Sequence, residues 1–212
     1  MDDPVDQPKP VLAVLISGGG RTLANLIERT ENGSLAARIG VVVSSKRDAG
    51  GLEIAQTAGI PAATIVRREF ESDAAYSDAV FETVEPYAPT LLILAGFLRK
   101  LVVPAKWEGR ILNIHPALLP ECSFAAGRGF YGDRVHQAVL DHGERQSGAT
   151  VHLVDNGYDT GPVLMRQAVP VLPGDDAHAL AARVFQAEKE LYPRAIEAYL
   201  EKLGAREQTP ES

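Results

Sequence analysis

Two polar side chains that could do chemistry stand two positions apart in the segment 111–120, ILNIHPALLP. Side chains two positions apart on a strand point to the same face, so Asn113 and His115 share one. Pro116 ends the strand immediately afterwards. A side-chain amide and a protonated imidazole both donate hydrogen bonds. Together they can hold an oxygen that becomes negative during acyl transfer, where one donor is worth about 3 kcal/mol. The alternative is a structural pair that caps the strand end.

A histidine in this role acts as a cation, so an acidic side chain is expected near it. The loop 154–162, VDNGYDTGP, offers two candidates. Asp159 is the first choice, since Asp155 directly follows the preceding strand. For both, the alternative is a role in forming the turn, which is common for aspartate in glycine-containing loops.

A second chemical feature is the glycine-rich stretch 17–22, SGGGRT. Glycines after a strand allow a tight turn, and the free N–H groups of the next helix then form an anion site, most often for phosphate. Arg21 and Thr22 add a charge and a hydroxyl. A dinucleotide fingerprint fits less well, because Leu23 occupies its last glycine position and the second strand ends without the expected acidic residue. A purely structural turn is the remaining alternative.

These residues follow predicted strands in a chain where strands and helices alternate. Apolar runs predict strands at 11–17, 39–44, 61–66, 91–95, 111–115, 149–154 and 163–169. Helical spacing predicts helices at 22–29, 51–58, 72–87, 133–141 and 177–203, with Ser72 as an N-cap. This order is typical of the α/β class, with an open, mostly parallel sheet and helices on both faces. Ligands of such sheets bind beyond the carboxyl ends of the strands, where SGGGRT, AGFLRK and NIHP all lie.

Composition limits the remaining possibilities. The 212 residues are 45% hydrophobic and 23% charged, as expected for one globular domain, which we place at 10–204 between disordered tails 1–9 and 205–212. A net charge of −7 argues against a nucleic-acid partner. The single cysteine, Cys122, excludes an internal disulfide. The sequence shows no signal peptide and no apolar run of about 20 residues, so we expect a cytoplasmic protein without a membrane partner.

Metal binding is also disfavoured by the sequence. A zinc site could be assembled from His115, His136 and His152. However, these histidines form no H-x-x-x-H pair and no cysteine accompanies them, so we predict no metal.

Six motifs, in this order along the chain, resemble those of the folate-dependent formyltransferases: SGGGRTL, LAGFLRKL, LNIHPALLP, SGATVHLVD, YDTGPVL and AEKELYP. The resemblance extends from about Val11 to Leu203 and is greatest to the branch that formylates glycinamide ribonucleotide. It implies a Rossmann-like formyltransferase fold with antiparallel C-terminal strands. It also implies transfer of a formyl group from 10-formyltetrahydrofolate to the amine of 5-phosphoribosylglycinamide (GAR) in purine biosynthesis, by a monomer or homodimer.

The same resemblance implies a role for individual residues. The catalytic residues would be Asn113, His115 and Asp159, with Asp159 keeping His115 protonated and positioning a water. The GAR-binding residues would be Gly20, Arg21, Thr22 and Glu188, the last of these near the amine. The folate-binding residues would be Leu98, Arg99, Lys100, Leu101 and Asn113.

The chain departs from the family pattern at three places. Ala117 stands where many relatives have serine, and Asp73 stands where some carry an arginine that reaches the folate. The segment 121–131, ECSFAAGRGFY, is either a substrate cover that uses Arg128 and Gly129 or only a mobile lid.

Other functions remain open at this point. A formyltetrahydrofolate hydrolase is expected to carry an extra N-terminal domain, and a methionyl-tRNA formyltransferase an extra C-terminal one. A formyltransferase with another amine acceptor and a non-catalytic module that binds phosphate ligands are further alternatives.

Overall fold

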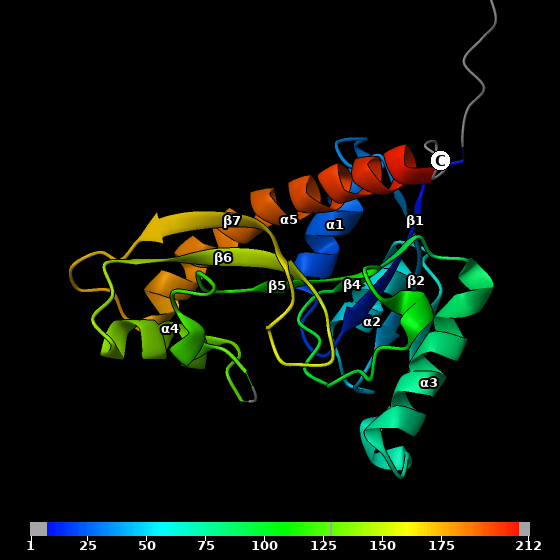
Figure 1. Cartoon of the computed structure of the whole chain (residues 1–212), viewed down its shortest axis with the longest axis horizontal. Helices are drawn as coiled ribbons and strands as arrows, with labels where there is room; N and C mark the ends of the chain where they lie inside the picture. The colour runs from blue at the N-terminus through cyan, green and yellow to red at the C-terminus, as the bar shows by residue number, and fades with distance from the viewer. Residues whose placement is uncertain (1–7, 128, 208–212) are drawn as a thin grey trace, which may run out of the picture.

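A seven-stranded sheet runs through the part of the chain that the computed structural model describes, residues 8–127 and 129–207 (Figure 1). The strand order is β3-β2-β1-β4-β5-β6-β7. Strands β1 to β5 pair in parallel, and β6 and β7 continue the sheet antiparallel, which confirms the predicted fold class. The strands are β1 Val11–Ile16, β2 Arg38–Ser44, β3 Ala62–Thr64, β4 Leu91–Leu94, β5 Ile111–His115, β6 Gln146–Leu153 and β7 Val163–Pro170.

Helices cover both faces of this sheet. The α-helices are α1 Arg21–Glu31, α2 Gly51–Thr57, α3 Asp73–Val84, α4 Asp133–Asp141 and α5 Ala177–Glu207. Short 3₁₀ helices are η1 Arg67–Glu69, η2 Glu85–Tyr87, η3 Ala105–Trp107 and η4 Ser123–Ala125. Helices α1 and α5 lie on one side of the sheet and α3 on the other (Figure 1). None of the described helices has the length and apolarity that a bilayer span requires.

Strand β1 shows why the core has two halves. Its side chains alternate between the faces, so Leu12 and Val14 pack on the side of α1 and α5, while Ala13 and Leu15 pack on the side of α3. All six residues of β1 are buried, as expected of a central parallel strand covered on both faces.

The element boundaries differ from the predictions in ways that local chemistry explains. Ser72 caps α3 as predicted, since its Oγ accepts from the N–H of Ala75 at 3.1 Å. The helix ends at Val84, before Pro86, which lacks an N–H and lies in the tighter turn η2. Strand β6 begins at Gln146, earlier than expected, because residues 146–148 find partners on β7.

The predicted tails need one correction. Helix α5 continues to Glu207, so the expectation of disorder from 205 onward is wrong for 205–207. Lys202, Leu203 and Ala205 all favour helices, and the single Gly204 does not interrupt them. The expected tail residues 1–7 and 208–212 lie outside the described residues.

The sheet brings the chemically interesting strand ends together. Leu94, at the end of β4, pairs with Leu15 on one side and Asn113 on the other. Ser17 links the turns beyond them, because its Oγ accepts from the N–H of Leu98 at 2.8 Å and lies 2.6 Å from the hydroxyl of Ser45. The loops after β1, β2 and β4 therefore form one connected edge beside the end of β5.

Candidate active site

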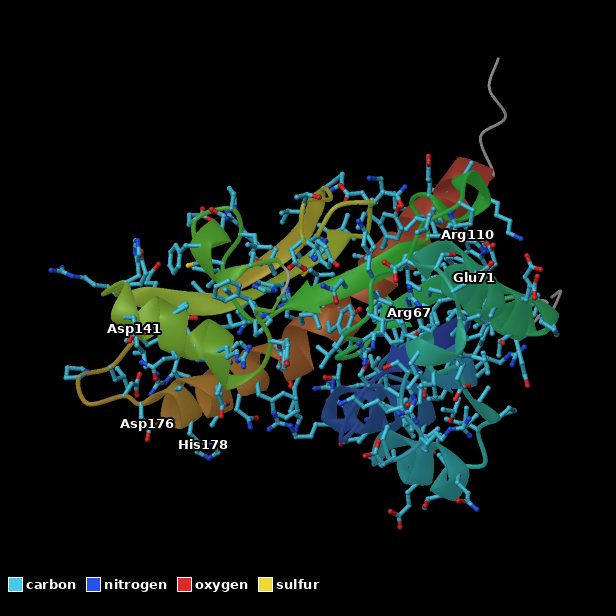
Figure 2. All side chains as sticks on the ribbon, turned by 90° about the horizontal axis from the view of Figure 1, so that it is seen from below. Arg67, Glu71, Arg110, Asp141, Asp176 and His178 are labelled. Carbon is cyan, nitrogen blue, oxygen red and sulfur yellow. The ribbon has the colours of Figure 1, made fainter. Side chains whose placement is uncertain are left out.

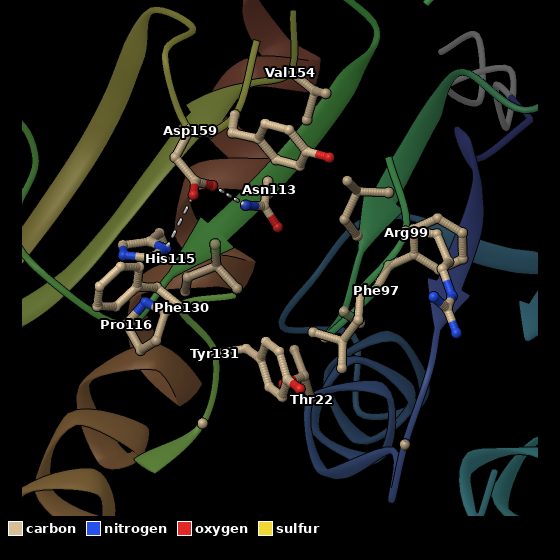
Figure 3. A pocket seen from close by; sticks show the side chains of 18 of the residues that line it. Thr22, Phe97, Arg99, Asn113, His115, Pro116, Phe130, Tyr131, Val154 and Asp159 are labelled. Atoms are coloured by element: carbon tan, nitrogen blue, oxygen red, sulfur yellow. Dashed lines mark hydrogen bonds and ion pairs between the residues drawn. The ribbon is translucent and has the colours of Figure 1, made fainter. Parts of the chain in front are cut away.

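A cavity of 670 Å³ lies at this edge of the sheet (Figure 3). Its walls are the glycine-rich turn before α1, the loop after β4, the end of β5, the segment after Gly127, the loop between β6 and β7, and α5. Every residue predicted for the site lines it: Gly20, Arg21, Thr22, Leu98, Arg99, Lys100, Leu101, Asn113, His115, Asp159 and Glu188.

Asp159 lies between Asn113 and His115. Its Oδ1 accepts from Asn113 Nδ2 at 3.3 Å, and its Oδ2 lies 3.7 Å from His115 Nδ1 (Figure 3). His115 is buried, and the side chain of Asp159 is 15% exposed. The spacing predicted that Asn113 and His115 share a strand face, the resemblance added Asp159, and the structure brings the three side chains together.

The hydrogen bonds define where the protons are. His115 Nε2 lies 3.0 Å from the carbonyl oxygen of Ala125. A carbonyl only accepts, so Nε2 carries a proton and Nδ1, which faces Asp159, is the atom that titrates. In the same way, His152 Nδ1 donates to the carbonyl of Leu153 at 2.8 Å. Its Nε2 is therefore free to accept from Asn113 Nδ2 at 3.1 Å.

This arrangement differs from the expectation for Asn113. The sequence suggested that its amide donates to a developing oxyanion. In the structure both N–H bonds of Nδ2 are directed at Asp159 and His152, and the amide oxygen points toward the cavity (Figure 3). Donation to a substrate oxygen would require Asn113 to give up one of these bonds, and the 3.3 Å bond to Asp159 is the longer of the two.

Two opposing effects set the charge of the cluster. Burial lowers the pKa of His115, and Asp159 raises it but does not fully compensate. For Asp159, burial opposes ionisation, but the rings of His152 and His115 and the N–H of Gly127 outweigh it and lower its pKa to about 2. The carboxylate is therefore charged at neutral pH, while the imidazole is held closer to neutrality than the sequence led us to expect.

The backbone of the β6–β7 loop orients Asp159. This residue has a φ of 54°, in the left-handed region that aspartate tolerates better than most residues. The rival candidate, Asp155, uses its carboxylate within the loop, accepting from the N–H of Gly157 and the hydroxyl of Thr160, both at 2.8 Å. Asp155 lines the cavity, but its bonds fit the turn-forming role that was the alternative for both aspartates.

The segment 121–131 takes part in the site. The carbonyl of Ala125 binds His115, and the N–H of Gly127 donates to Asp159 Oδ2 at 3.0 Å. Gly129, Phe130 and Tyr131 line the cavity, whereas Arg128 lies outside the described residues. The segment therefore contacts both His115 and Asp159.

The glycine-rich turn forms the far wall of the cavity. Gly20 is the N-cap of α1 with a φ of 78°, and a Cβ there would lie 2.6 Å from the Cα of Gly51. Only glycine satisfies both conditions. The first helical residue, Arg21, extends over the ring of Phe185 on α5, 4.4 Å from its centroid. A cation thus stands beside the free N–H groups of a helix N-terminus, as an anion site requires.

Glu188 lies on α5 in the same wall. Burial raises its pKa to about 7, and the nearby Arg21 only partly opposes this. A carboxyl with this pKa is poised to gain or lose a proton near neutrality, which is a property of functional sites more often than of surface side chains.

The stretch predicted to bind folate forms the loop after β4. Leu101 is buried, Leu98 is exposed, and the ammonium of Lys100 lies 5.1 Å from the ring centroid of Tyr158. Asp73, which replaces an arginine of some relatives, forms an ion pair with Arg67, and both line the cavity.

Two further histidines of the site were considered in the sequence only as members of a disfavoured zinc site. His152 lies directly opposite Asn113 on β6, and only the antiparallel register reveals this pairing. His136 on α4 also lines the cavity, where burial lowers its pKa to about 4 and its Nδ1 has no hydrogen-bond partner in the described chain. Within residues 8–127 and 129–207, no group of three or more His, Cys, Asp or Glu side chains is arranged to hold a metal.

The sheet order and the cavity beyond the carboxyl ends of its parallel strands define a Rossmann-like α/β protein. Comparison with known proteins specifies the family. Residues 11–196 match the family described as formyl transferase, and the chain belongs to that family.

Individual relatives agree with this assignment. The chain is 37% identical over 188 residues to phosphoribosylglycinamide formyltransferase of Escherichia coli (strain K12), covering 87% of this chain and 84% of that protein. It is 40% identical over 194 residues to the trifunctional purine biosynthetic protein adenosine-3 of Bos taurus, covering 90% of this chain but only 18% of the bovine protein. The crystal structure of phosphoribosylglycinamide formyltransferase from Brucella melitensis superposes with a TM-score of 0.79 at 42% identity, covering 90% and 95% of the two chains.

Proposed function

We propose that the chain transfers the formyl group of 10-formyltetrahydrofolate to the amine of GAR, giving formyl-GAR and tetrahydrofolate in de novo purine biosynthesis. The observation that carries this proposal is the placement of the Asn113–His115–Asp159 cluster in one cavity with an anion site at the N-terminus of α1. The names of the Escherichia coli and Brucella melitensis relatives support the same reaction.

The two ends of the cavity suit the two substrates. Arg21, Thr22 and the turn at Gly20 would bind the phosphate of GAR, and Glu188 would lie near its amine. The loop after β4, with Leu98, Arg99, Lys100 and Leu101, would contact the folate together with Asn113. Holding both substrates in one cavity aligns the amine with the formyl carbon and lowers the entropic part of the barrier.

The reaction is a direct transfer. The amine nitrogen attacks the formyl carbon, and the carbonyl electron pair moves onto oxygen. His115 Nδ1–H and Asn113 Nδ2–H would donate to this oxyanion, with Asn113 exchanging its longer bond to Asp159. A water held by Asp159 would carry the proton of the attacking nitrogen to N10 of the folate. The carbonyl then reforms as the bond to N10 breaks, and tetrahydrofolate leaves.

The electrostatics of the site support this sequence. Burial disfavours imidazolium in the free cavity, so its formation is coupled to a negative charge that appears nearby. Asp159 lowers the free-energy cost of forming the imidazolium, because its carboxylate already faces His115 Nδ1. The proposal includes no metal, since every step uses side chains and water.

The wider properties of the protein belong to the same proposal. We place a single formyltransferase domain at residues 10–204, acting in the cytoplasm as a monomer or homodimer. Its partners are the two small substrates, with no nucleic acid and no membrane.

The test is to follow tetrahydrofolate release from 10-formyltetrahydrofolate with and without GAR. The proposal expects release only with GAR, strong loss in His115→Ala, and normal rates in His178→Ala. His178 is the matched control, because it is exposed at the start of α5 and does not line the cavity. Figure 2 shows it beside Asp176, away from Arg67, which does line the cavity. Release without GAR would favour a hydrolase, turnover only with another amine would change the acceptor, and tight binding without turnover would favour a phosphate-binding module.

A further inference from the structure

An aromatic side chain on α5, Phe185, reaches the anion site that the proposed function assigns to the phosphate of GAR. Phe185 and Glu188 both line the cavity, and residues three apart on a helix lie on one face of it. The guanidinium carbon of Arg21 lies 4.4 Å from the centroid of the Phe185 ring. A cation within about 6 Å over an aromatic face is attracted by the quadrupole of the ring. The contact therefore restricts where the positive charge of the site can lie.

Arg21 lies where its own helix does not favour a cation. It is the first residue of α1, and the N-terminus of a helix carries a partial positive charge. The first turn of α1 contains no acidic residue that would offset this charge. Among the described residues, no carboxylate forms an ion pair with Arg21 either. The stacking on Phe185 is therefore the contact that can hold this side chain in place before a ligand binds.

Stacking also leaves the hydrogen-bonding part of Arg21 free. A guanidinium stacks through its planar face, while its N–H bonds lie along its edge. An ion pair with a carboxylate occupies these N–H bonds instead, as in the pair of Arg29 Nη2 with Glu190 Oε1 at 2.5 Å. The stacked Arg21 keeps its edge for an anion from solution, and a phosphate can accept two parallel N–H bonds from one guanidinium.

The packing of α1 against α5 determines where this contact forms. The two helices lie side by side (Figure 1). Three residues of α1 spaced four apart, Arg21, Asn25 and Arg29, contact α5. Asn25 Nδ2 donates to the carbonyl of Lys189 at 3.0 Å, and Arg29 pairs with Glu190. Arg21 is the member of this row that lines the cavity, because it lies at the N-terminus of α1.

We infer that Phe185 is a positioning residue for the acceptor substrate: its ring holds the Arg21 guanidinium at the N-terminus of α1, with the N–H edge free for the phosphate of GAR. This inference rests on the proposed function and adds to it a residue that acts through Arg21. An arginine that is held in place before GAR arrives loses less side-chain freedom on binding, so GAR binds more tightly. The alternative is a purely structural contact that joins α1 to α5, and the two interpretations predict different kinetics.

The expected effect of Phe185→Leu is a higher KM for GAR at an unchanged kcat. Arg21 is exposed, so losing the stacking should lower the population of its held conformer, and with it the affinity for GAR, about two- to fivefold. This change is equivalent to about 0.5–1 kcal/mol. KM for 10-formyltetrahydrofolate should stay the same. Phe185→Tyr keeps an aromatic face and should therefore retain the wild-type KM for GAR.

The experiment measures kcat and KM for both substrates in the wild type, Phe185→Leu, Phe185→Tyr, Arg21→Leu and Arg21→Leu/Phe185→Leu. If Phe185 acts through Arg21, adding Phe185→Leu to Arg21→Leu should raise KM for GAR no further. The matched control is Glu190→Gln, which breaks the ion pair between α1 and α5 outside the cavity and should keep the wild-type constants. A thermal melt checks the folding of each variant, and Phe185→Met takes the place of Phe185→Leu if leucine unfolds the protein.

The outcomes separate this inference from the function beneath it. An unchanged KM for GAR in Phe185→Leu, or an equal rise in Phe185→Tyr, would overturn the positioning role and leave the formyl transfer intact. Additive effects of Phe185→Leu and Arg21→Leu would overturn it as well, because Phe185 would then act independently of Arg21. An equal rise in Glu190→Gln would show that helix packing, and not the stacking, is responsible. No turnover of GAR by the wild type would overturn the proposed function and this inference with it.

Discussion

Asp159→Asn is the most informative single change, because it removes a charge from the cluster of Asn113, His115 and Asp159 and keeps the size of the side chain. The carboxylate oxygen lies 3.7 Å from His115 Nδ1, the atom that titrates. At an effective dielectric constant of about 20, a charge pair at this distance is worth at most roughly 4.5 kcal/mol. Allowing for screening through the open side of the cavity, we expect about 1.5–3 kcal/mol. That is roughly a 10- to 100-fold fall in the imidazolium population at neutral pH.

The direction of the pH effect follows from the sign of each contribution. Burial already lowers the pKa of His115, and Asp159 is the main opposing influence. Asparagine removes that opposition, so the pKa of His115 should fall further. If the imidazolium is the active form, the rate falls as pH rises through this pKa, and the falling limb of the profile should move toward acid. Acid should restore only part of the rate, because under the proposed mechanism the variant also loses the group that positions water for proton transfer.

The assay is a pH–rate profile of both proteins, combined with NMR titration of His115 in each. Asp155→Asn is the matched control, since it removes a carboxylate from the same loop whose bonds go to Gly157 and Thr160. We expect this control to lower thermal stability while leaving the pKa of His115 unchanged. An unchanged His115 titration in Asp159→Asn, or an equal change in both variants, would refute the assignment of Asp159 as the charge partner.

Further predictions concern the other parts of the cavity. His115→Ala should lower kcat roughly 100- to 1,000-fold with little change in substrate affinity, because an oxyanion donor acts mainly in the transition state; kinetics and a thermal melt decide this. Arg21→Leu should weaken GAR binding more than folate binding in calorimetry, and an equal loss for both would contradict the phosphate assignment. Glu188→Gln should increase stability at pH 8 by about 2 kcal/mol but not at pH 4, where the carboxyl is neutral. The folded pKa of about 7 exceeds the ordinary 4.5, so stability is lost as pH rises between them. Tyr192→Phe should cost about 1–2 kcal/mol of unfolding free energy in denaturant titrations, since its buried hydroxyl shares one proton between the carbonyls of Leu94 and Leu112.

The fold was largely predictable because its signals are local and repeated. Apolar runs alternate with amphipathic segments, and this pattern alone indicates a mostly parallel sheet with helices on both faces. The ends of elements were less predictable, because they depend on neighbours. Strand β6 begins at Gln146 only because β7 offers it hydrogen-bond partners, and Pro86 changes the last turn of α3 rather than continuing it.

The candidate site was predictable where a single segment carries the signal. Asn113 and His115 share a strand, and Gly20 and Arg21 share a turn, so their spacing already defines their direction. Nothing local connects Asp159 to them, and its position in the loop favoured it over Asp155 without excluding a turn-forming role for either aspartate. The resemblance to known formyltransferases favoured Asp159, and the structure then placed its carboxylate beside His115.

His152 could not be foreseen for a related reason. Its place opposite Asn113 depends on the antiparallel register of β5 and β6, which nothing within either strand specifies. The hydrogen bond from His115 to the carbonyl of Ala125 was equally unpredictable from the sequence. Every residue has a backbone carbonyl, and which one reaches His115 depends on the path of the loop.

The charge states were the least accessible to sequence reasoning, because burial acts on acids and bases in opposite directions. The same exclusion of water lowers the pKa of the His115 imidazole and raises that of the Glu188 carboxyl to about 7. Burial therefore disfavours the charged form of both groups. Asp159 and the carbonyl of Ala125 partly oppose this effect at His115, and Arg21 partly opposes it at Glu188. A cavity of this kind keeps its acid and its base responsive to the charge of whatever enters it. An ammonium group near Glu188 would favour the ionised carboxylate, and an oxyanion near His115 would favour the protonated imidazole. Substrate binding itself would therefore produce the charges that the proposed reaction needs.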